Sequence, residues 1–322
     1  MSAQAHALAK SRYDDATTAT FAADVLSGLT AQPKRLPPKY FYDATGSALF
    51  EEITRLPEYY PTRTELGILG ERSAEIAALI PNGAALIEFG AGATTKARLL
   101  LASGAFGAYV PVDISGEFLN AQASQLRADL PELPVYPVTA DFTASFVLPK
   151  PVQAMPKAGF FPGSTIGNFE PHEAALFLRS IRAILGRDAW LIVGVDLEKD
   201  ERILAAAYND AAGVTARFDL NLLARINHEL GGTFDLDAFR HRAIYNRERH
   251  RIEMHLISRK AQEVRVEGRR IAFHDGETIH TENSYKYSLE RFATLARGAG
   301  WTPHASWTDR DVTFSVHALR AG

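Results

Sequence analysis

Short apolar runs alternate with helical stretches between residues 84 and 196, and this alternation limits the folds open to the chain. The runs with strand-like composition cover residues 84–89, 108–113, 134–139, 157–162 and 189–196. The stretches with the spacing of amphipathic helices cover residues 94–103, 116–130 and 171–185. Apolar strands separated by helices are typical of a parallel sheet covered on both faces. The pattern therefore predicts an α/β fold.

The alternation stops after Asp196, and the chain between residues 197 and 286 has a different character. It contains a helical stretch, AAYNDAAGVTARF, a basic segment, HRAIYNRERHR, and two runs typical of antiparallel strands, IEMHLISR and EVRVEG. Residues 287–322 have the pattern of a helix, a glycine stop and two strands separated by a polar turn. Such a pair would complete the parallel sheet with antiparallel strands.

These patterns predict two domains. Residues 61–196 and 287–322 form the α/β domain, and residues 1–60 and 197–286 form a second, α+β domain. The N-terminal part contains an aromatic segment, PPKYFYDATGSALFEEITRLPEYYPTRTE, which we expect to pack against the insertion.

Composition argues against several classes of function. Charged residues make up 23% of the 322 residues and the formal net charge is −3, so nothing favours a nucleic acid or membrane partner. The absence of cysteine excludes disulfides, thiolate catalysis and cysteine-based metal sites. The histidines form no close ligand pair, so no metal is predicted. No apolar stretch resembles a signal peptide or a membrane span, so a cytoplasmic protein is expected.

The segment LIEFGAGATTKARLL, residues 86–100, places glycines directly after a strand and before a helix. Such a turn brings backbone N–H groups and a helix N-terminus close to a ligand. Gly90 and Gly92 fill the first two positions of the dinucleotide fingerprint G-x-G-x-x-G, but Thr95 occupies the third. Glu88 lies at the strand tip, where an anion would repel a pyrophosphate and suit a cationic sulfonium ligand with an amino group.

Acidic residues also follow the next two strands. Asp113 is placed to accept hydrogen bonds from ribose hydroxyls, which alone fits NAD equally well. Asp141 could accept from an adenine amine while Phe142 packs on the ring. The three acids together favour S-adenosylmethionine (SAM), and the C-terminal strand pair favours the same ligand because class I methyltransferases carry an extra antiparallel strand. NAD(P), or no nucleotide at all, remains the alternative.

Longer motifs strengthen this interpretation. The chain resembles the ergothioneine-pathway histidine Nα-methyltransferase family from about residue 25 to the C-terminus, in LPPKYFYDATGSALFEEITRLPEYYPTRTE, FFPGSTIGN, AAYNDAAGVTARFDLNLL, FDLDAFRHRAIYN, RIEMHL and HTENSYKYS. The resemblance implies a class I SAM-dependent methyltransferase (Rossmann-like) domain with a second, α+β substrate-binding domain. It also implies trimethylation of the α-amino group of L-histidine to hercynine, with SAM as methyl donor. A monomer is expected.

The resemblance also assigns cofactor and amine contacts. The residues that contact SAM would be Gly90, Lys96, Asp113, Asp141 and Phe142, to which the glycine turn adds Glu88 and Gly92. Asn168 and Tyr208 correspond to residues that hold the α-amino and carboxylate end of the amino acid. Tyr42 and Tyr59 correspond to tyrosines that line the amine, so Tyr42, Tyr59 and Asn168 are the predicted catalytic residues.

The same resemblance assigns the residues that contact the side chain of the substrate. Glu282 and Ser284 correspond to the pair that reads the imidazole, and Phe218 and Met254 fall close to the substrate side chain. Methyl transfer to an amine needs a neutral nitrogen lone pair and accurate positioning, which can lower a barrier by roughly 7–11 kcal/mol. No general base is assigned, because water or a tyrosine oxygen could receive the proton.

Three alternatives remain open from the sequence. A relative with altered imidazole-reading residues could methylate another amino acid such as tryptophan, although Glu282 and Ser284 argue against this. A SAM-binding sensor without catalysis is the second alternative. The segment HRAIYNRERHR could bind RNA, but the acids beside its arginines favour a solvated hairpin.

Overall fold

The computed structural model describes residues 18–104 and 106–322, and this part of the chain divides into two compact units. The first unit contains the described residues up to 53 together with residues 205–245 and 252–282. The second unit contains residues 54–204, 246–251 and 283–322. Residues 1–17 of the predicted second domain lie outside the described residues. What each unit binds, and the predicted domain boundaries, stay predictions.

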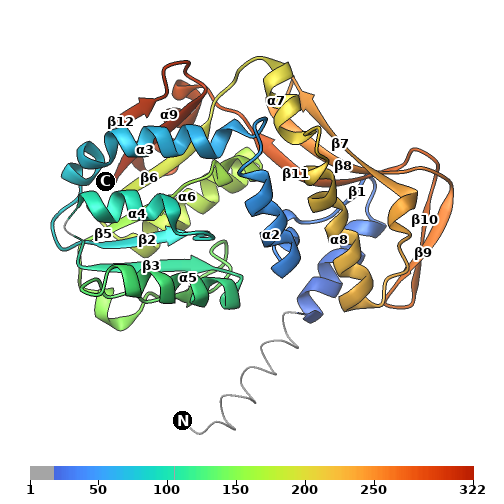
Figure 1. Ribbon diagram of the computed structural model, residues 1–322, viewed down its shortest axis with the longest axis horizontal. Helices are drawn as coiled ribbons and strands as arrows, with labels where there is room; N and C mark the ends of the chain where they lie inside the picture. Colours follow the sequence, from blue (N-terminus) through green and yellow to red (C-terminus); the bar gives the residue numbers. More distant parts are fainter. Residues whose placement is uncertain (1–17, 105) are drawn as a thin grey trace, which may run out of the picture. The chain divides into compact units, whose positions relative to one another are not determined.

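The second unit is built on a mixed sheet with the strand order β12-β13-β6-β5-β2-β3-β4 (Figure 1). Its strands are β2 (Ala85–Phe89), β3 (Ala108–Asp113), β4 (Val138–Thr139), β5 (Lys157–Phe161), β6 (Trp190–Asp196), β12 (Trp301–Thr308) and β13 (Phe314–Ala321). The strands from β6 to β4 are parallel, and β13 is antiparallel to both of its neighbours, β6 and β12. The predicted α/β sheet with its C-terminal antiparallel pair is therefore confirmed.

Helices cover both faces of this sheet. Successive side chains of β2 point to opposite faces, and each face buries its apolar side chains against a different set of helices. Leu86 packs into an apolar cluster with α3 (Tyr60–Leu79), α4 (Thr95–Ser103) and α5 (Gly116–Asp129). Ile87 packs into the cluster on the other face, with α6 (Pro171–Leu185) and α9 (Leu289–Gly298). All residues of β2 are buried, as expected for a central parallel strand. Short helical turns η2 (Lys150–Val152) and η3 (Thr165–Asn168) complete this unit.

Most predicted elements between residues 84 and 196 are observed with bounds that differ by no more than one residue. The predicted strand 134–139 is the exception, because only Val138 and Thr139 form a strand, and Val135 makes a single bridge to Tyr109. Pro134 and Pro137 explain the difference, since proline has no N–H to donate to a strand ladder. The prediction for residues 134–137 was therefore wrong.

The first unit contains a sheet with the strand order β1-β11-β8-β7 and a separate hairpin of β9 and β10. The strands are β1 (Lys34–Arg35), β7 (Phe239–Asn246), β8 (Arg251–Ser258), β9 (Gln262–Val266), β10 (Arg269–Phe273) and β11 (Thr278–Tyr285). The helical elements near these strands in sequence are η1 (Pro38–Phe41), α2 (Ala44–Ile53), α7 (Glu201–Tyr208), α8 (Val214–Leu230) and η4 (Leu236–Ala238), and residues 18–30 are also helical.

Aromatic side chains join the N-terminal segment to the insertion within this unit. The rings of Phe41 and Phe218 stack with centroids 4.6 Å apart, and Tyr42 approaches Phe218 edge-on at 5.8 Å. The expected packing of the aromatic segment against the insertion is confirmed for these residues. The basic segment forms β7 and an exposed turn at residues 247–249, followed by β8. Both runs predicted as antiparallel strands form strands, but β9 pairs with β10.

Two helical glycines allow a direct stability test. A Cβ added at Gly28 would lie 2.0 Å from the backbone carbonyl oxygen of Arg35, whereas a Cβ at Gly67 would meet nothing within 4 Å. We expect Gly28→Ala to destabilise the protein by about 1–3 kcal/mol through overpacking. Gly67→Ala is the matched control and should stabilise it by about 0.5–1 kcal/mol, the ordinary helix preference of alanine over glycine. Thermal unfolding measures both, and equal effects of the two substitutions would contradict the close approach at Gly28.

Candidate cofactor and substrate site

The glycine turn after β2 lies at the carboxyl edge of the sheet, where the chain order places a switch point between β2 and β5. Gly90 and Gly92 have φ angles of +72° and +44°, a backbone region that favours glycine. The N–H groups of Gly90 and Ala91 donate to the carbonyl oxygen of Val112, at 2.8 and 3.1 Å. The turn is therefore fixed against the end of β3.

Asp113, at the end of β3, holds the same turn from the side. Its carboxylate accepts from the backbone N–H of Gly92 at 3.1 Å and of Ser115 at 2.9 Å. Burial raises the pKa of Asp113, although these backbone donors act in the opposite direction. The carboxylate thus lies where the sequence predicted a ribose acceptor, and its contact with a ribose stays a prediction.

Phe142 packs directly on the glycine turn. A Cβ added at Gly90 would lie 3.2 Å from the Cε1 atom of the Phe142 ring, so only a glycine leaves this contact undisturbed. Asp141, the residue before it, accepts from the backbone N–H of Thr143 at 2.9 Å. The structure therefore brings Gly90, Gly92, Asp113 and Phe142 to one edge of the sheet. The contact of this edge with the adenosine part of SAM stays a prediction.

The charge state of Glu88 differs from the one expected from the sequence. The side chain is 1% exposed, and its carboxyl group accepts a hydrogen bond from the hydroxyl of Tyr109. Burial raises the pKa of Glu88 to about 8. At neutral pH the group is therefore mostly protonated, and the electrostatic reason for assigning it to a cationic ligand is weakened. Its direct contact with SAM stays a prediction.

Glu65 is a buried carboxylate that the sequence analysis did not identify. It accepts from the backbone N–H of Gly163 at 2.8 and 3.1 Å and forms an ion pair with Lys96 at 2.7 Å. A Cβ at Gly194 would lie 1.9 Å from its Oε1 atom. The signal was present, because Glu65 stands in α3 at a helical interval between the buried residues Pro61 and Ile68–Leu69. The carboxylate fixes Lys96, which the resemblance assigns to SAM.

Asn168 ends the loop that follows β5. Ser164 in this loop has a φ of 57°, and its hydroxyl accepts from the backbone N–H of Asp196 at 2.9 Å. A Cβ at Gly167 would lie 2.7 Å from the carbonyl oxygen of Tyr285. The loop is therefore held on both sides within the second unit, which gives Asn168 a defined backbone position.

The predicted substrate residues come from both units. Tyr42, Tyr208, Phe218, Met254 and Glu282 belong to the first unit, and Tyr59, Asn168 and Ser284 belong to the second. Tyr208, Phe218 and Met254 are buried in the first unit, and Tyr59 and Ser284 in the second. Glu282 and Ser284 occupy alternate positions of β11 and so point to the same side of that strand. The role of each residue in substrate binding stays a prediction.

Tyr208 is held by a buried pair that the sequence did not reveal. The Nδ1 atom of His241 lies 2.7 Å from a carboxylate oxygen of Asp219, and its Nε2 atom lies 2.8 Å from the carbonyl oxygen of Tyr208. Burial lowers the pKa of His241, but the hydrogen bond and charge of Asp219 outweigh it and raise the pKa above its usual range. Each ring nitrogen of His241 therefore lies within hydrogen-bond distance of an oxygen, which fixes the ring against the backbone at the end of α7.

No helix among the described residues is long and apolar enough to cross a membrane. Within the same residues, no group of histidine and acidic side chains is arranged to hold a metal ion.

The strand order, the reversed strand β13, and the glycine turn with Asp113 and Phe142 beside it define a class I SAM-dependent methyltransferase. Residues 21–321 match the family described as histidine-specific, SAM-dependent methyltransferases. The chain belongs to this family. This confirms three predictions from the sequence: the fold class, the family and SAM as the cofactor.

Curated relatives cover nearly the whole chain. It is 43% identical to the histidine N-alpha-methyltransferase of Mycolicibacterium smegmatis over 91% of this chain and 92% of that protein. It is 39% identical to the histidine N-alpha-methyltransferase of Mycobacterium tuberculosis over 94% and 95% of the two chains. A solved structure from Bordetella parapertussis, titled as a possible exported protein, superposes with a TM-score of 0.51 at 10% identity and covers 100% of this chain and 99% of its own. That likeness concerns the fold alone.

Glu65 gives a test of the cofactor side. Replacing Glu65 by glutamine removes the negative charge paired with Lys96. The ammonium of Lys96 is then left without its buried counter-charge, which is energetically unfavourable. We expect Glu65→Gln to raise the Kd for SAM at least ~10-fold, measured by calorimetry. Glu71→Gln, an exposed position of the same helix, is the matched control and should leave the Kd within about 2-fold. An unchanged Kd in a folded Glu65→Gln variant would contradict the placement of Lys96 at SAM.

Glu88 predicts a pH dependence of stability. Its folded pKa of about 8 lies above the ordinary value of 4.5, so the folded state keeps this proton where the unfolded state releases it. The stabilising contribution of Glu88 to the free energy of unfolding is fully present below about pH 4.5 and is lost as the pH rises through about 8. We expect the difference in melting temperature between Glu88→Gln and the wild type to shift in favour of the variant from pH 5 to pH 8. A constant difference over this range would show that Glu88 is ionised in the folded protein.

Proposed function

We propose that the protein transfers methyl groups from SAM to the α-amino group of L-histidine three times, producing hercynine as the first step of ergothioneine biosynthesis. Membership of the histidine-specific family supports the amino acid, and the two mycobacterial relatives support the position of methylation by their names. A protein of Neurospora crassa named Ergothioneine biosynthesis protein 1 is 32% identical over 86% of this chain, which spans 32% of that protein. Its name supports the proposed pathway.

The observation that carries the choice of histidine is the pair Glu282 and Ser284 on one side of β11. A carboxylate accepts an N–H from the imidazole ring, and a serine hydroxyl serves the other ring nitrogen. A side chain without ring nitrogens would leave the polar groups of the site unpaired, which is the kind of mismatch that enzymes reject strongly. Another amino acid, such as tryptophan, is the alternative acceptor, and this pair argues against it.

Tyrosine and asparagine side chains suit the reacting end of the substrate. Tyr42, Tyr59 and Asn168 offer hydroxyl and amide groups, which can hold an amine through its successive methylation states without placing a full charge beside the sulfonium of SAM. The nucleophile must be the neutral amine, because a protonated nitrogen has no lone pair. Reaction ends at the third methyl group for the same reason, since a quaternary nitrogen has no lone pair left.

The proposal includes a monomer that acts in the cytoplasm on free L-histidine, as expected from the sequence. Light scattering of the purified protein measures the first point, and fractionation of producing cells measures the second. A non-catalytic SAM-binding protein is the remaining alternative, and it is distinguished by binding of SAM without any methylated product.

The test of the function uses a panel of free amino acids with SAM, and mass spectrometry of the products. We expect a mass gain of three methyl groups on histidine and none on tryptophan. Glu282→Ala should raise the KM for histidine about 10- to 150-fold, since hydrogen bonds to charged groups contribute about 1.5–3 kcal/mol. Its KM for SAM should stay within about 2-fold, because the assigned role concerns the imidazole alone.

Glu282→Gln is the matched variant, because an amide oxygen still accepts a hydrogen bond without the charge. Its KM for histidine should lie between those of the wild type and Glu282→Ala. Methylation of another amino acid but not of histidine would disprove the proposed substrate, and a selective loss of SAM binding in Glu282→Ala would disprove the assigned role of Glu282.

A further inference from the structure

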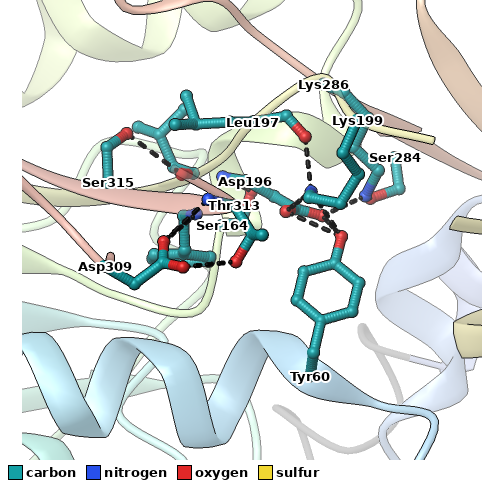
Figure 2. Close-up of polar contacts among 12 residues, drawn as sticks. Tyr60, Ser164, Asp196, Leu197, Lys199, Ser284, Lys286, Asp309, Thr313 and Ser315 are labelled. Carbon is teal, nitrogen blue, oxygen red and sulfur yellow. Dashed lines mark hydrogen bonds and ion pairs between the residues drawn. The ribbon is translucent and has the colours of Figure 1, made fainter. Parts of the chain in front are cut away.

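A buried ion cluster lies at the carboxyl end of β6 in the second unit (Figure 2). Asp196, 1% exposed, pairs with Lys199 at 2.6 Å and with Lys286 at 2.7 Å. The hydroxyl of Tyr60 donates to the same carboxylate at 2.7 and 2.8 Å. Burial raises the pKa of Asp196, but the two lysines outweigh it and hold the pKa below its usual range, so the carboxyl group stays ionised. Two cations are thereby fixed on one anion.

The two lysines differ in what else they contact. Lys286 is fully buried, and its ammonium donates to the hydroxyl oxygen of Ser284 at 2.8 Å (Figure 2). Lys199 instead donates to the hydroxyl of Tyr60 at 2.6 Å and to the carbonyl oxygen of Leu197. The cluster therefore joins Asp196 to Ser284 through Lys286.

A serine hydroxyl next to an ammonium has a restricted role. An ammonium has three N–H donors and no lone pair, so Lys286 can contact Ser284 only by donating to its oxygen. The hydrogen of the hydroxyl must then point away from Lys286, and the oxygen keeps one further lone pair. The fixed positive charge also makes the hydroxyl a stronger donor and a poorer acceptor.

We propose that Lys286 is a positioning residue that fixes Ser284 as a hydrogen-bond donor, so that the enzyme accepts histidine only with a neutral imidazole ring. The inference rests on the proposed function, in which Ser284 reads one ring nitrogen. A neutral imidazole has one N–H, which suits Glu282, and one bare nitrogen, which accepts from Ser284. An imidazolium has N–H on both nitrogens, so it would direct a donor at a donor and bring a second cation toward Lys286.

The first experiment uses the wild-type protein and compares histidine with 1,2,4-triazole-3-alanine, whose ring does not gain a proton near neutrality. Both substrates carry the same α-amino group, so its titration cancels in the ratio of their kcat/KM values. We expect kcat/KM for histidine, relative to the triazole, to fall about 10-fold per pH unit below the ring pKa of about 6.5. A ratio that stays constant from pH 5.5 to pH 8 would overturn the proposal.

The second experiment is a double-mutant cycle of Lys286→Met and Ser284→Ala, with Lys199→Met as the matched control. Lys199→Met also removes one ammonium from Asp196 but leaves the contact between Lys286 and Ser284 intact. We expect Lys286→Met to raise the KM for histidine about as much as Ser284→Ala, and the double variant to be no worse than either single one. Lys199→Met should leave this KM within about 2-fold, and the KM for SAM should change little in all variants.

The outcomes separate the inference from the proposed function. If the wild type does not methylate histidine, the proposed function fails. If it does, and Lys286→Met resembles Lys199→Met or adds fully to Ser284→Ala, the positioning role of Lys286 is wrong while the function stands. Lys286→Arg retains a cation and should keep the steep pH dependence of the wild type, whereas Lys286→Met should flatten it. If Lys286→Met does not fold, the wild-type comparison with the triazole decides the inference alone.

Discussion

Parallel pairing of β2 with β3 on one side and β5 on the other is the constraint on which the rest of the second unit depends. Because these strands run the same way, their carboxyl ends meet at one edge, and the connections leave β2 and β5 toward different sides of the sheet. The glycine turn, Asp113, Phe142 and the loop that ends at Asn168 all follow strands at this edge. Residues far apart in the chain therefore reach a common region without any long loop.

Buried ion pairs are the second organising feature. Glu65 faces Lys96 and the N–H of Gly163, while Asp196 faces Lys199 and Lys286. In the first unit, Asp219 faces His241. An isolated charge in such surroundings would be costly, so each pair fixes the geometry of the groups around it. These pairs lie beside predicted site residues, namely Lys96, Ser284 and Tyr208.

The part of the fold that follows from local pattern was predictable from the sequence. The helix at 171–185 and the strand at 108–113 have clear ends in the sequence. The acids at the ends of the strands led to the prediction of SAM, which membership of the family confirms, whereas their contacts with SAM stay predictions. Residues 134–137 were not predictable by the same means, because an apolar run hides the loss of N–H donors at two prolines. The charge of Glu88 could not be predicted either, since it depends on burial against Tyr109 rather than on its place in the chain. Lys286 is an ordinary surface residue by sequence, and only the structure shows it fully buried against Ser284 and Asp196.

The contact between Gly194 and Glu65 has a consequence for how this enzyme can change. The space that a side chain on β6 would occupy is filled by a carboxylate from α3, so the two positions share one volume. A larger residue at position 194 is compatible only with a smaller one at position 65, and that exchange would leave Lys96 without its partner. Substitution of Gly194 is therefore coupled to position 65 and, through the ion pair, to Lys96. In a mutational library, we expect the effects of substitutions at positions 65, 96 and 194 to be non-additive, because these residues are in contact. Recombination that exchanges β6 but not α3 between distant relatives would break a matched combination of residues.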